Sequence, residues 1–219
     1  QSLRSGECRM ALAGGVNVIL APEATVALSR SKMLSPEGRC KAFDDSADGF
    51  VRAEGCVVLV LKRLSDATAD GDRILAIVRG SATNQDGRTS GLTVPSGPAQ
   101  EAVIRQALAD AGVRPDEVDF VEAHGTGTSL GDPIEAHALV AALGRQRPAD
   151  KPLYVGSVKA NLGHLEAAAG ATGLLKAALA LSRETIPPQL YFRRWNRNID
   201  LKGAPLTVAV APVRWSRGA

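Results

Sequence analysis

Aromatic residues are scarce in this sequence and make up only 4% of its 219 residues. A hydrophobic core must therefore be built mainly from Ala, Val, Leu and Ile, within a hydrophobic content of 45% that is ordinary for globular proteins. The sequence also lacks an apolar run as long as a membrane-spanning helix requires. We therefore predict a soluble globular chain with no membrane partner.

Cysteine is also rare. The sequence has only Cys8, Cys40 and Cys56, and no two of them form a CxxC pair. This pattern argues against a disulfide framework and against a cysteine-based zinc site, and no HExxH motif offers another metal site. We expect no bound metal and a reducing, cytoplasmic compartment. Because Cys56 stands inside an apolar strand pattern, we expect it to lie in the core.

The excess of positive charge is small, with a formal net charge of +3 at pH 7. This value argues against nucleic acid as the main partner. The sequence of residues 125–131 does not fit GxGxxG, and no GxxxxGK[ST] occurs, so no nucleotide loop is indicated. Residues 191–197 mix arginines with aromatics, a pattern open to an acidic partner or RNA, but we favour a loop packed on the body of the protein.

Apolar periodicity divides the chain into alternating strands and helices. The predicted strands are residues 10–20, with a bend at Gly14-Gly15, and residues 55–61, 73–78, 118–122 and 153–158. The predicted helices are residues 64–69, 98–111, 132–143 and 165–182, and residues 82–97 form a long polar loop. This alternation predicts an α/β fold with a parallel or mixed sheet.

Residues typical of helix ends support this division. Pro98 suits the first turn of a helix, and Gly112 suits its C-terminal end. Asp132 is expected to cap the next helix, with Pro133 at its first position and Gly144 at its end.

Two of the three histidines, His124 and His164, each follow a predicted strand and stand beside glycine, which lets backbone approach closely. If the two strands are parallel neighbours, their carboxyl ends bring both imidazoles to one edge of the sheet. The third, His137, falls inside a predicted helix and is interpreted as a packing or surface residue. The pair therefore predicts a shared substrate site, and no nearby serine or cysteine has the pattern of its nucleophile.

The predicted position of His164 suggests its chemistry. At the start of a helix, the partial positive charge of the helix N-terminus favours the neutral imidazole. A neutral ring donates one hydrogen bond to a developing oxyanion or enolate. Lys159, at the end of the preceding predicted strand, is expected to orient Glu166 or to favour negative charge in the site.

The amino-acid sequence around these histidines resembles that of a known family. Residues 122–136, EAHGTGTSLGDPIEA, and residues 156–170, GSVKANLGHLEAAAG, closely resemble the two histidine motifs of β-ketoacyl synthases. In detail they are similar to ketosynthase domains of modular or iterative type I polyketide synthases, with freestanding, type II fatty-acid ketosynthases as the alternative. Residues 12–17, 39–55 and 83–87 agree, so the resemblance covers nearly the whole chain.

The resemblance implies a thiolase-like fold of layered α/β/α/β/α architecture, here incomplete. Residues 1–95 would be the C-terminal part of its first half and residues 96–219 most of its second half, together one partial ketosynthase domain. It implies decarboxylative Claisen condensation of an acyl-cysteine intermediate with a malonyl or methylmalonyl thioester. The expected partners are an acyl carrier protein, a second copy in a homodimer and a neighbouring acyltransferase domain. No cofactor is expected to bind directly, because the substrates are carried on phosphopantetheine.

The resemblance also implies roles for single residues. His124 and His164 would hold the extender carbonyl and stabilise its enolate, supported by Lys159 and Glu166. Asn161 would order the loop before His164. Two further side chains would line the pantetheine arm, namely Thr126 and Thr128.

The sequence departs from the family in one respect. The family nucleophile stands in a Thr-Ala-Cys-Ser-Ser-Ser type segment, which this chain does not contain. We therefore expect a fragment truncated at both ends, without its nucleophile and inactive alone. A non-elongating, decarboxylating carrier-binding relative and a purely structural piece are the alternatives.

Overall fold

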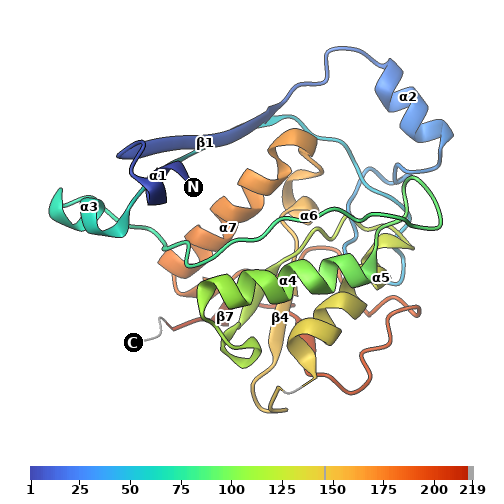
Figure 1. The fold of residues 1–219 in the computed structure, drawn as a ribbon. Coiled ribbons are helices and arrows are strands. Elements are labelled where there is room, and N and C mark those ends of the chain that lie inside the picture. Colours follow the sequence, from blue (N-terminus) through green and yellow to red (C-terminus); the bar gives the residue numbers. More distant parts are fainter. Residues whose placement is uncertain (146, 217–219) are drawn as a thin grey trace.

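The computed structural model describes residues 1–145 and 147–216, and residues 146 and 217–219 of the predicted second half lie outside the described part. Helices and strands alternate along the chain, as the sequence predicts (Figure 1). The helices are α1 Ser2–Ser5, α2 Glu23–Arg30, α3 Leu64–Ala69, α4 Gly97–Ala111, η1 Pro115–Glu117, α5 Gly131–Leu139, η2 Val140–Gly144, α6 Lys159–Leu162, η3 Glu166–Ala168 and α7 Ala169–Ser182. The strands are β1 Met10–Asn17, β2 Gly55–Lys62, β3 Phe120–Glu122, β4 Leu153–Gly156, β5 Thr185–Ile186, β6 Leu206–Val208 and β7 Val213–Arg214.

A short parallel sheet lies at the centre, with β4 between β3 and β6. Phe120 pairs with Tyr154 and Glu122 with Gly156, so β3 and β4 end together. The predicted parallel sheet is confirmed. Its register brings the segments that carry both histidines to one edge.

The helices cover this sheet in layers. α7 packs against β3 on one side and against the β1–β2 hairpin on the other, while α4 packs on α5. The main core cluster joins α5 and η2 to the central strands and is almost entirely aliphatic, with Phe43 as its one fully buried aromatic among the described residues. Because Leu153 and Val155 alternate with Tyr154 along β4, they point into this core.

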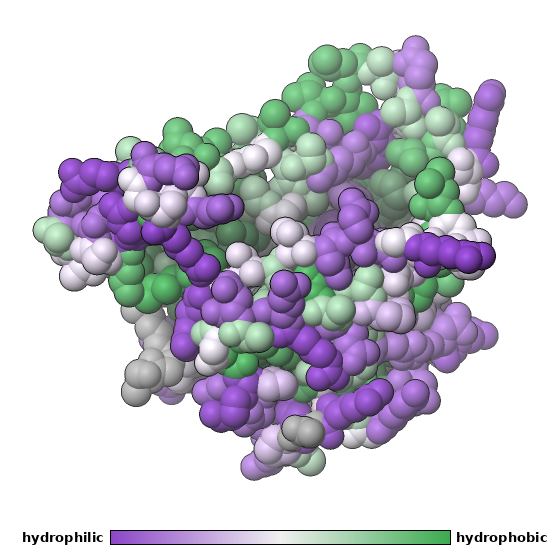
Figure 2. All heavy atoms as spheres, in the orientation of Figure 1, coloured by the Kyte–Doolittle hydropathy of each residue, from purple (hydrophilic) through white to green (hydrophobic). Residues whose placement is uncertain are grey.

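The β1–β2 hairpin is covered on one face only. The strands pair antiparallel from Met10 opposite Lys62 to Asn17 opposite Gly55. Side chains of alternate residues are exposed, among them Leu12 at 70% and Val60 at 66%. Hydrophobic groups are visible along the upper rim of the molecule, where β1 and the segment after it run (Figure 2). Cys56 belongs to the uncovered face and is exposed, so the prediction that it lies in the core is wrong.

The predicted strand over residues 73–78 does not form. The structure gives these residues no ladder partner, and the side chains of Ile74, Leu75, Ile77 and Val78 are 41–57% exposed. A strand is stable only when its backbone groups are paired by a neighbour. None of the described strands runs alongside this segment, so its apolar pattern alone is insufficient.

The glycines of β1 have a different role from the bend that the sequence suggests. The ladder continues from Met10 to Asn17 without interruption. A Cβ at Gly15 would lie 2.4 Å from the carbonyl oxygen of Ala167. Gly15 is therefore required for the close approach of η3 to the hairpin, and the predicted bend is wrong.

The predicted ends of α4 are confirmed, with Ser96 accepting from the Ala99 N–H and Gly112 closing the helix at φ 62°. The predicted C-terminal ends of the next two long helices also agree, since α5 continues as η2 to Gly144 and α7 ends at Ser182, but their starts differ from the prediction. Asp132 lies inside α5, which begins at Gly131, and its carboxylate accepts N–H groups from the loop before the helix. The α-helix predicted from residue 165 begins at Ala169, since a 3-10 turn precedes it.

Among the described residues, every helix is too short or too polar to cross a membrane.

We expect the Leu153→Ala substitution to lower the free energy of unfolding by about 2–5 kcal/mol, since it leaves a cavity in the core. Leu153 is fully buried, whereas Leu162 is 54% exposed and serves as the matched control. Urea unfolding of both variants measures the difference. Equal losses for Leu153→Ala and Leu162→Ala would contradict the placement of the core at β4.

Candidate functional site

The segments after β3 and β4 meet and bring the two histidines together. The ring centroids of His124 and His164 are 5.6 Å apart, and the ring planes are nearly perpendicular at 82°. Lys159 joins them from the first turn of α6, where its Nζ donates to the backbone carbonyl of His124 at 2.6 Å. The predicted imidazole pair and the predicted lysine therefore lie in one cluster.

Two carboxylates of α5 fix the backbone that carries His124. Glu135 accepts the N–H groups of His124 and Gly125 at 2.7 and 2.8 Å. Asp132, which is 1% exposed, accepts those of Gly127 and Thr128 at 3.2 and 3.3 Å. Burial raises the pKa of both carboxyl groups, and these N–H donors oppose that rise.

Neither carboxylate is among the predicted site residues. The sequence does contain a signal for them, since Asp132 and Glu135 are three residues apart and share one helix face. A glycine-rich loop ahead of a helix also presents backbone N–H groups that need acceptors. Together these features point to carboxylates as the ligands of the loop.

Gly127 permits the close packing of this loop on the segment around Cys40. Its φ of +80° lies in the left-handed region, and an added Cβ would be 2.6 Å from the backbone nitrogen of Lys41. The carbonyl of Gly127 also accepts the N–H of Gly49 at 2.9 Å. The segment from residue 39 to 50 is thus held directly against the histidine loop.

His164 is held from both its backbone and its ring. Its N–H donates to Val51 at 2.7 Å, and its carbonyl accepts from Ala53 at 2.9 Å. The ring Nδ1 accepts the backbone N–H of Glu166 at 2.9 Å. In the neutral ring the proton is therefore on Nε2, which becomes the hydrogen-bond donor.

Glu166 is paired with Arg52 and not with Lys159, so of the two alternatives predicted for Lys159 the one in which it orients Glu166 is wrong. Both carboxylate oxygens of Glu166 bind the Arg52 guanidinium, which also donates to Thr25 at 2.8 Å. Glu166 has a φ of 45°, a strained value for a non-glycine residue. The ion pair helps to hold this conformation and, with it, the N–H that faces the His164 ring.

The electrostatic surroundings favour neutral imidazoles. Burial, followed by the positive charge of Lys159, lowers the pKa of His164. His124 is partly open to solvent, yet desolvation of its ring by the surrounding protein lowers its pKa to about 4. The positive charges of Lys159 and His164 act in the same direction. The neutral state of His164 agrees with the prediction, but its cause is different, because the helix expected to start there begins only at Ala169.

Lys159 itself is 4% exposed. Burial lowers its pKa, while the charges of Glu135 and Glu122 act in the opposite direction. Glu122 accepts the N–H of Val158 and pairs with Lys176 of α7 at 2.8 Å. The cations Lys159 and Lys176 thus lie near carboxylates of the cluster. Through its two contacts, Glu122 also links the ends of β3 and β4 to α7.

The remaining predicted residues are placed as follows. Thr126 and Thr128 lie side by side in the histidine loop, with their hydroxyl oxygens 3.2 Å apart. Asn161 is exposed on α6, and within the described residues its side chain has no hydrogen bond, so its ordering role stays a prediction.

No described cysteine is hydrogen-bonded to either histidine. The Cys40 sulfur accepts the Val51 N–H at 3.3 Å, and burial raises the pKa of this thiol. Cys8 is partly buried and Cys56 is exposed. The described residues also contain no cluster of side chains suited to a metal ion.

Two family models match the chain. Residues 1–67 match the model described as beta-ketoacyl synthase, N-terminal domain, and residues 75–193 match the one described as beta-ketoacyl synthase, C-terminal domain. The second match alone covers more than half of the chain.

Curated relatives agree with these matches. The chain is 54% identical over 215 residues to a phenolphthiocerol/phthiocerol polyketide synthase of Mycobacterium tuberculosis, an alignment that covers 98% of the chain and 12% of that protein. It is 51% identical over 217 residues to the polyketide synthase GfsE of Streptomyces halstedii, covering 99% of the chain and 6% of that protein. The chain therefore spans only a small part of these relatives.

Solved structures agree as well. The ketosynthase from module 6 of the bacillaene synthase of Bacillus subtilis aligns with a TM-score of 0.94 and 43% identity, over 100% of this chain and 40% of its own. The oxazolomycin ketosynthase domain from Streptomyces albus aligns with a TM-score of 0.92 and 41% identity, over 98% of this chain and 37% of its own. The predicted thiolase-like α/β fold is confirmed.

We expect Lys159→Met to raise the pKa of both His124 and His164, because a nearby positive charge that opposes their protonation is removed. Titration of the histidine ring signals by NMR measures the change. Lys151→Met, which removes a 49% exposed lysine side chain, is the control and should leave both values as they are. Unchanged or lower values in a folded Lys159→Met variant would contradict this account.

Proposed function

This chain belongs to the β-ketoacyl synthase family, and we propose that within a polyketide synthase it supplies the decarboxylation half of a ketosynthase active site. One observation carries the proposal. Two imidazoles, His124 and His164, lie with their ring centroids 5.6 Å apart above the ends of parallel strands, in surroundings that lower the pKa of both. This arrangement offers two hydrogen-bond donors to one carbonyl oxygen.

The proposed step starts from a malonyl or methylmalonyl thioester. The bond to its carboxylate breaks, carbon dioxide leaves, and the electron pair passes into an enolate whose oxygen takes up negative charge. That enolate then attacks an acyl-cysteine thioester, and the cysteine thiolate is the leaving group. His124 and His164 donate to the enolate oxygen, the atom whose charge grows most in the transition state.

The neighbouring residues support the two donors. The Glu166 N–H directs the His164 proton to Nε2, and Lys159 anchors the carbonyl of His124. The positive charge of Lys159 also favours negative charge on the enolate oxygen over the neutral thioester carbonyl from which that oxygen derives. Thr126 and Thr128 are proposed to lie along the pantetheine arm that brings the thioester to the site.

The wider assignment follows from the family. Residues 1–95 are proposed to be the C-terminal part of one thiolase-like half and residues 96–219 most of the other. The substrates are proposed to arrive on the phosphopantetheine of an acyl carrier protein, with no cofactor bound directly. A homodimer, a neighbouring acyltransferase domain and a cytoplasmic location complete the proposal.

A decarboxylating relative that does not elongate is the second candidate, since no described cysteine is hydrogen-bonded to either histidine. The residue that the parent protein has in the family's Thr-Ala-Cys-Ser-Ser-Ser type segment separates the two. Cysteine there supports condensation, and glutamine supports decarboxylation alone.

We expect His164→Ala in the full-length parent to slow malonyl decarboxylation by about 100- to 1,000-fold, the usual loss when one oxyanion donor is removed. Release of labelled carbon dioxide from malonyl carrier thioester measures the rate. His137→Ala is the control. His137 lies on α5 outside the site, where its ring Nε2 accepts the backbone N–H of Asp200. Wild-type decarboxylation in the His164→Ala variant would refute the role proposed for this residue.

The isolated 219-residue chain is expected to form no condensation product from acyl and malonyl carrier thioesters. Its buried Cys40 thiol has a raised pKa and bonds only to the backbone of Val51 among the described residues. Mass spectrometry of the carrier-bound products provides the readout, with the full-length parent as the positive control. Any β-ketoacyl product that depends on the isolated chain would overturn this expectation.

A further inference from the structure

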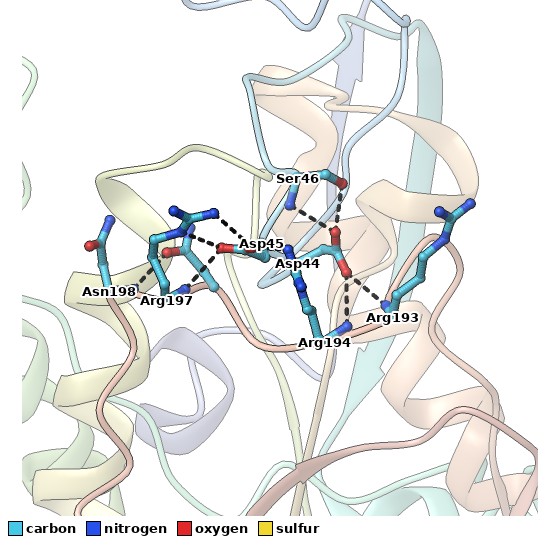
Figure 3. Close-up of polar contacts among 8 residues, drawn as sticks. Asp44, Asp45, Ser46, Arg193, Arg194, Arg197 and Asn198 are labelled. Atoms are coloured by element: carbon cyan, nitrogen blue, oxygen red, sulfur yellow. Dashed lines mark hydrogen bonds and ion pairs between the residues drawn. The ribbon is translucent and has the colours of Figure 1, made fainter.

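Arginine and carboxylate side chains pair in two different settings in this structure. The first is the arginine-rich loop of residues 191–197, where Asp45 binds two arginines whose side chains stay 74% and 77% exposed (Figure 3). Exposed ion pairs of this kind contribute little to stability. In the same loop, Trp195 packs on Phe43 and Phe192 with ring centroids 6.1 and 5.3 Å away, so the favoured prediction of a loop packed on the body of the protein is confirmed for these rings.

The second setting is the turn after His164, where the Arg52 side chain is only 10% exposed. Its Nε and Nη2 donate to the two carboxylate oxygens of Glu166, and its Nη1 donates to the Thr25 hydroxyl of α2 at 2.8 Å. The backbone of Arg52 also forms a β-bridge with His164. The main chain and the side chain of this one residue therefore both contact the turn that presents the imidazole.

A free carboxylate two residues from His164 would interfere with the decarboxylation proposed above. An imidazole N–H that donates to a carboxylate is fixed in one tautomer, and its charged form is stabilised. If the Glu166 side chain accepted a proton from Nδ1, the ring Nε2 of the neutral imidazole would become an acceptor. It would then no longer donate to the enolate oxygen.

The observed arrangement prevents this contact. Both oxygens of Glu166 are bound by the guanidinium of Arg52, and these hydrogen bonds are the main cause of the lowered pKa of Glu166. The Nδ1 of His164 accepts the backbone N–H of Glu166 at 2.9 Å instead. Burial and then the charge of Lys159 lower the pKa of His164, whereas the charge of Glu166 acts in the opposite direction. The ion pair therefore places a compensating positive charge on the one carboxylate that favours protonation of this ring.

We propose that Arg52 is a positioning residue for the decarboxylation, which occupies the Glu166 carboxylate so that the proton of the neutral His164 ring stays on Nε2, an inference that rests on the proposed function. The alternative is that the ion pair only supports the strained backbone of Glu166, whose φ is 45°. Glutamine at this position has no charge but meets the same backbone strain. Adding Glu166→Gln to Arg52→Met therefore separates the effect of charge from that of strain.

The test follows decarboxylation of malonyl N-acetylcysteamine thioester by the full-length parent, as labelled carbon dioxide released at a series of pH values. We expect Arg52→Met to slow the reaction about 10- to 100-fold, part of the loss that follows when one oxyanion donor is removed. As the pH is lowered, the rate should begin to fall at a higher pH than in the wild type, because the unpaired Glu166 carboxylate favours the protonated His164 ring. Adding Glu166→Gln should recover most of the rate, because glutamine removes the charge and keeps the backbone N–H.

Arg114→Met is the matched control. Arg114 binds Asp116 through paired hydrogen bonds of 3.1 and 3.3 Å, but its side chain is 69% exposed and lies at η1, outside the site. This variant should keep the wild-type rate and pH dependence. If Arg52→Met does not fold, Arg52→Lys takes its place, since lysine keeps the charge but lacks the planar fork. It should slow the reaction to a smaller extent, and Glu166→Gln should again reverse the loss.

The outcomes separate this inference from the proposed function. A wild-type rate in a folded Arg52→Met variant, or in Arg52→Lys where it takes its place, would overturn the inference. Equal losses with and without Glu166→Gln would also overturn it, because the pair would then serve the strained backbone alone. The same holds for an equal loss in Arg114→Met. Failure of the wild type to release carbon dioxide would instead refute the proposed function.

Discussion

The capture of backbone N–H groups by Asp132 is the constraint on which the rest of the structure depends. One of its oxygens holds Gly127 and Thr128 in the histidine loop, and the other holds Phe43 at 2.6 Å. Through Phe43 the same carboxylate reaches the segment whose next residues, Asp44 and Asp45, bind the arginine-rich loop. Glu135 repeats this arrangement one helical turn later for His124 itself.

Such an arrangement is costly to build, because a buried carboxylate loses its hydration. The cost is offset only where several N–H donors converge on the same group, which a glycine-rich loop can supply because its backbone approaches closely. Lys159 adds a positive charge beside Glu135 and Glu122. The loop is therefore fixed in position by a polar network within the core, and small residues around it are required by geometry.

How much of this structure the sequence predicts depends on how far apart along the chain the interacting residues stand. Strand and helix patterns are local, so the parallel pair β3 and β4 and the meeting of His124 with His164 could be predicted. The partner of Glu166 could not, because Arg52 stands 114 residues away. The predictions for Cys56 and residues 73–78 are wrong for a related reason, since an apolar strand pattern does not say whether a neighbour covers it. Asp132 and Glu135 lay within reach of local reasoning, through their shared helix face and the loop of N–H groups ahead of it.

Neutral imidazoles suit the proposed decarboxylation better than charged ones. An imidazolium would bind the malonyl carboxylate strongly and would stabilise the ground state that must be lost. A neutral N–H donor binds a thioester carbonyl weakly and an enolate oxygen strongly, so its effect grows towards the transition state. By opposing protonation of both rings, Lys159 keeps them in this form, while its own charge favours the anion that they hold. The same buried lysine therefore serves the chemistry twice, and it can do so only because the carboxylates of Glu122 and Glu135 make its burial tolerable.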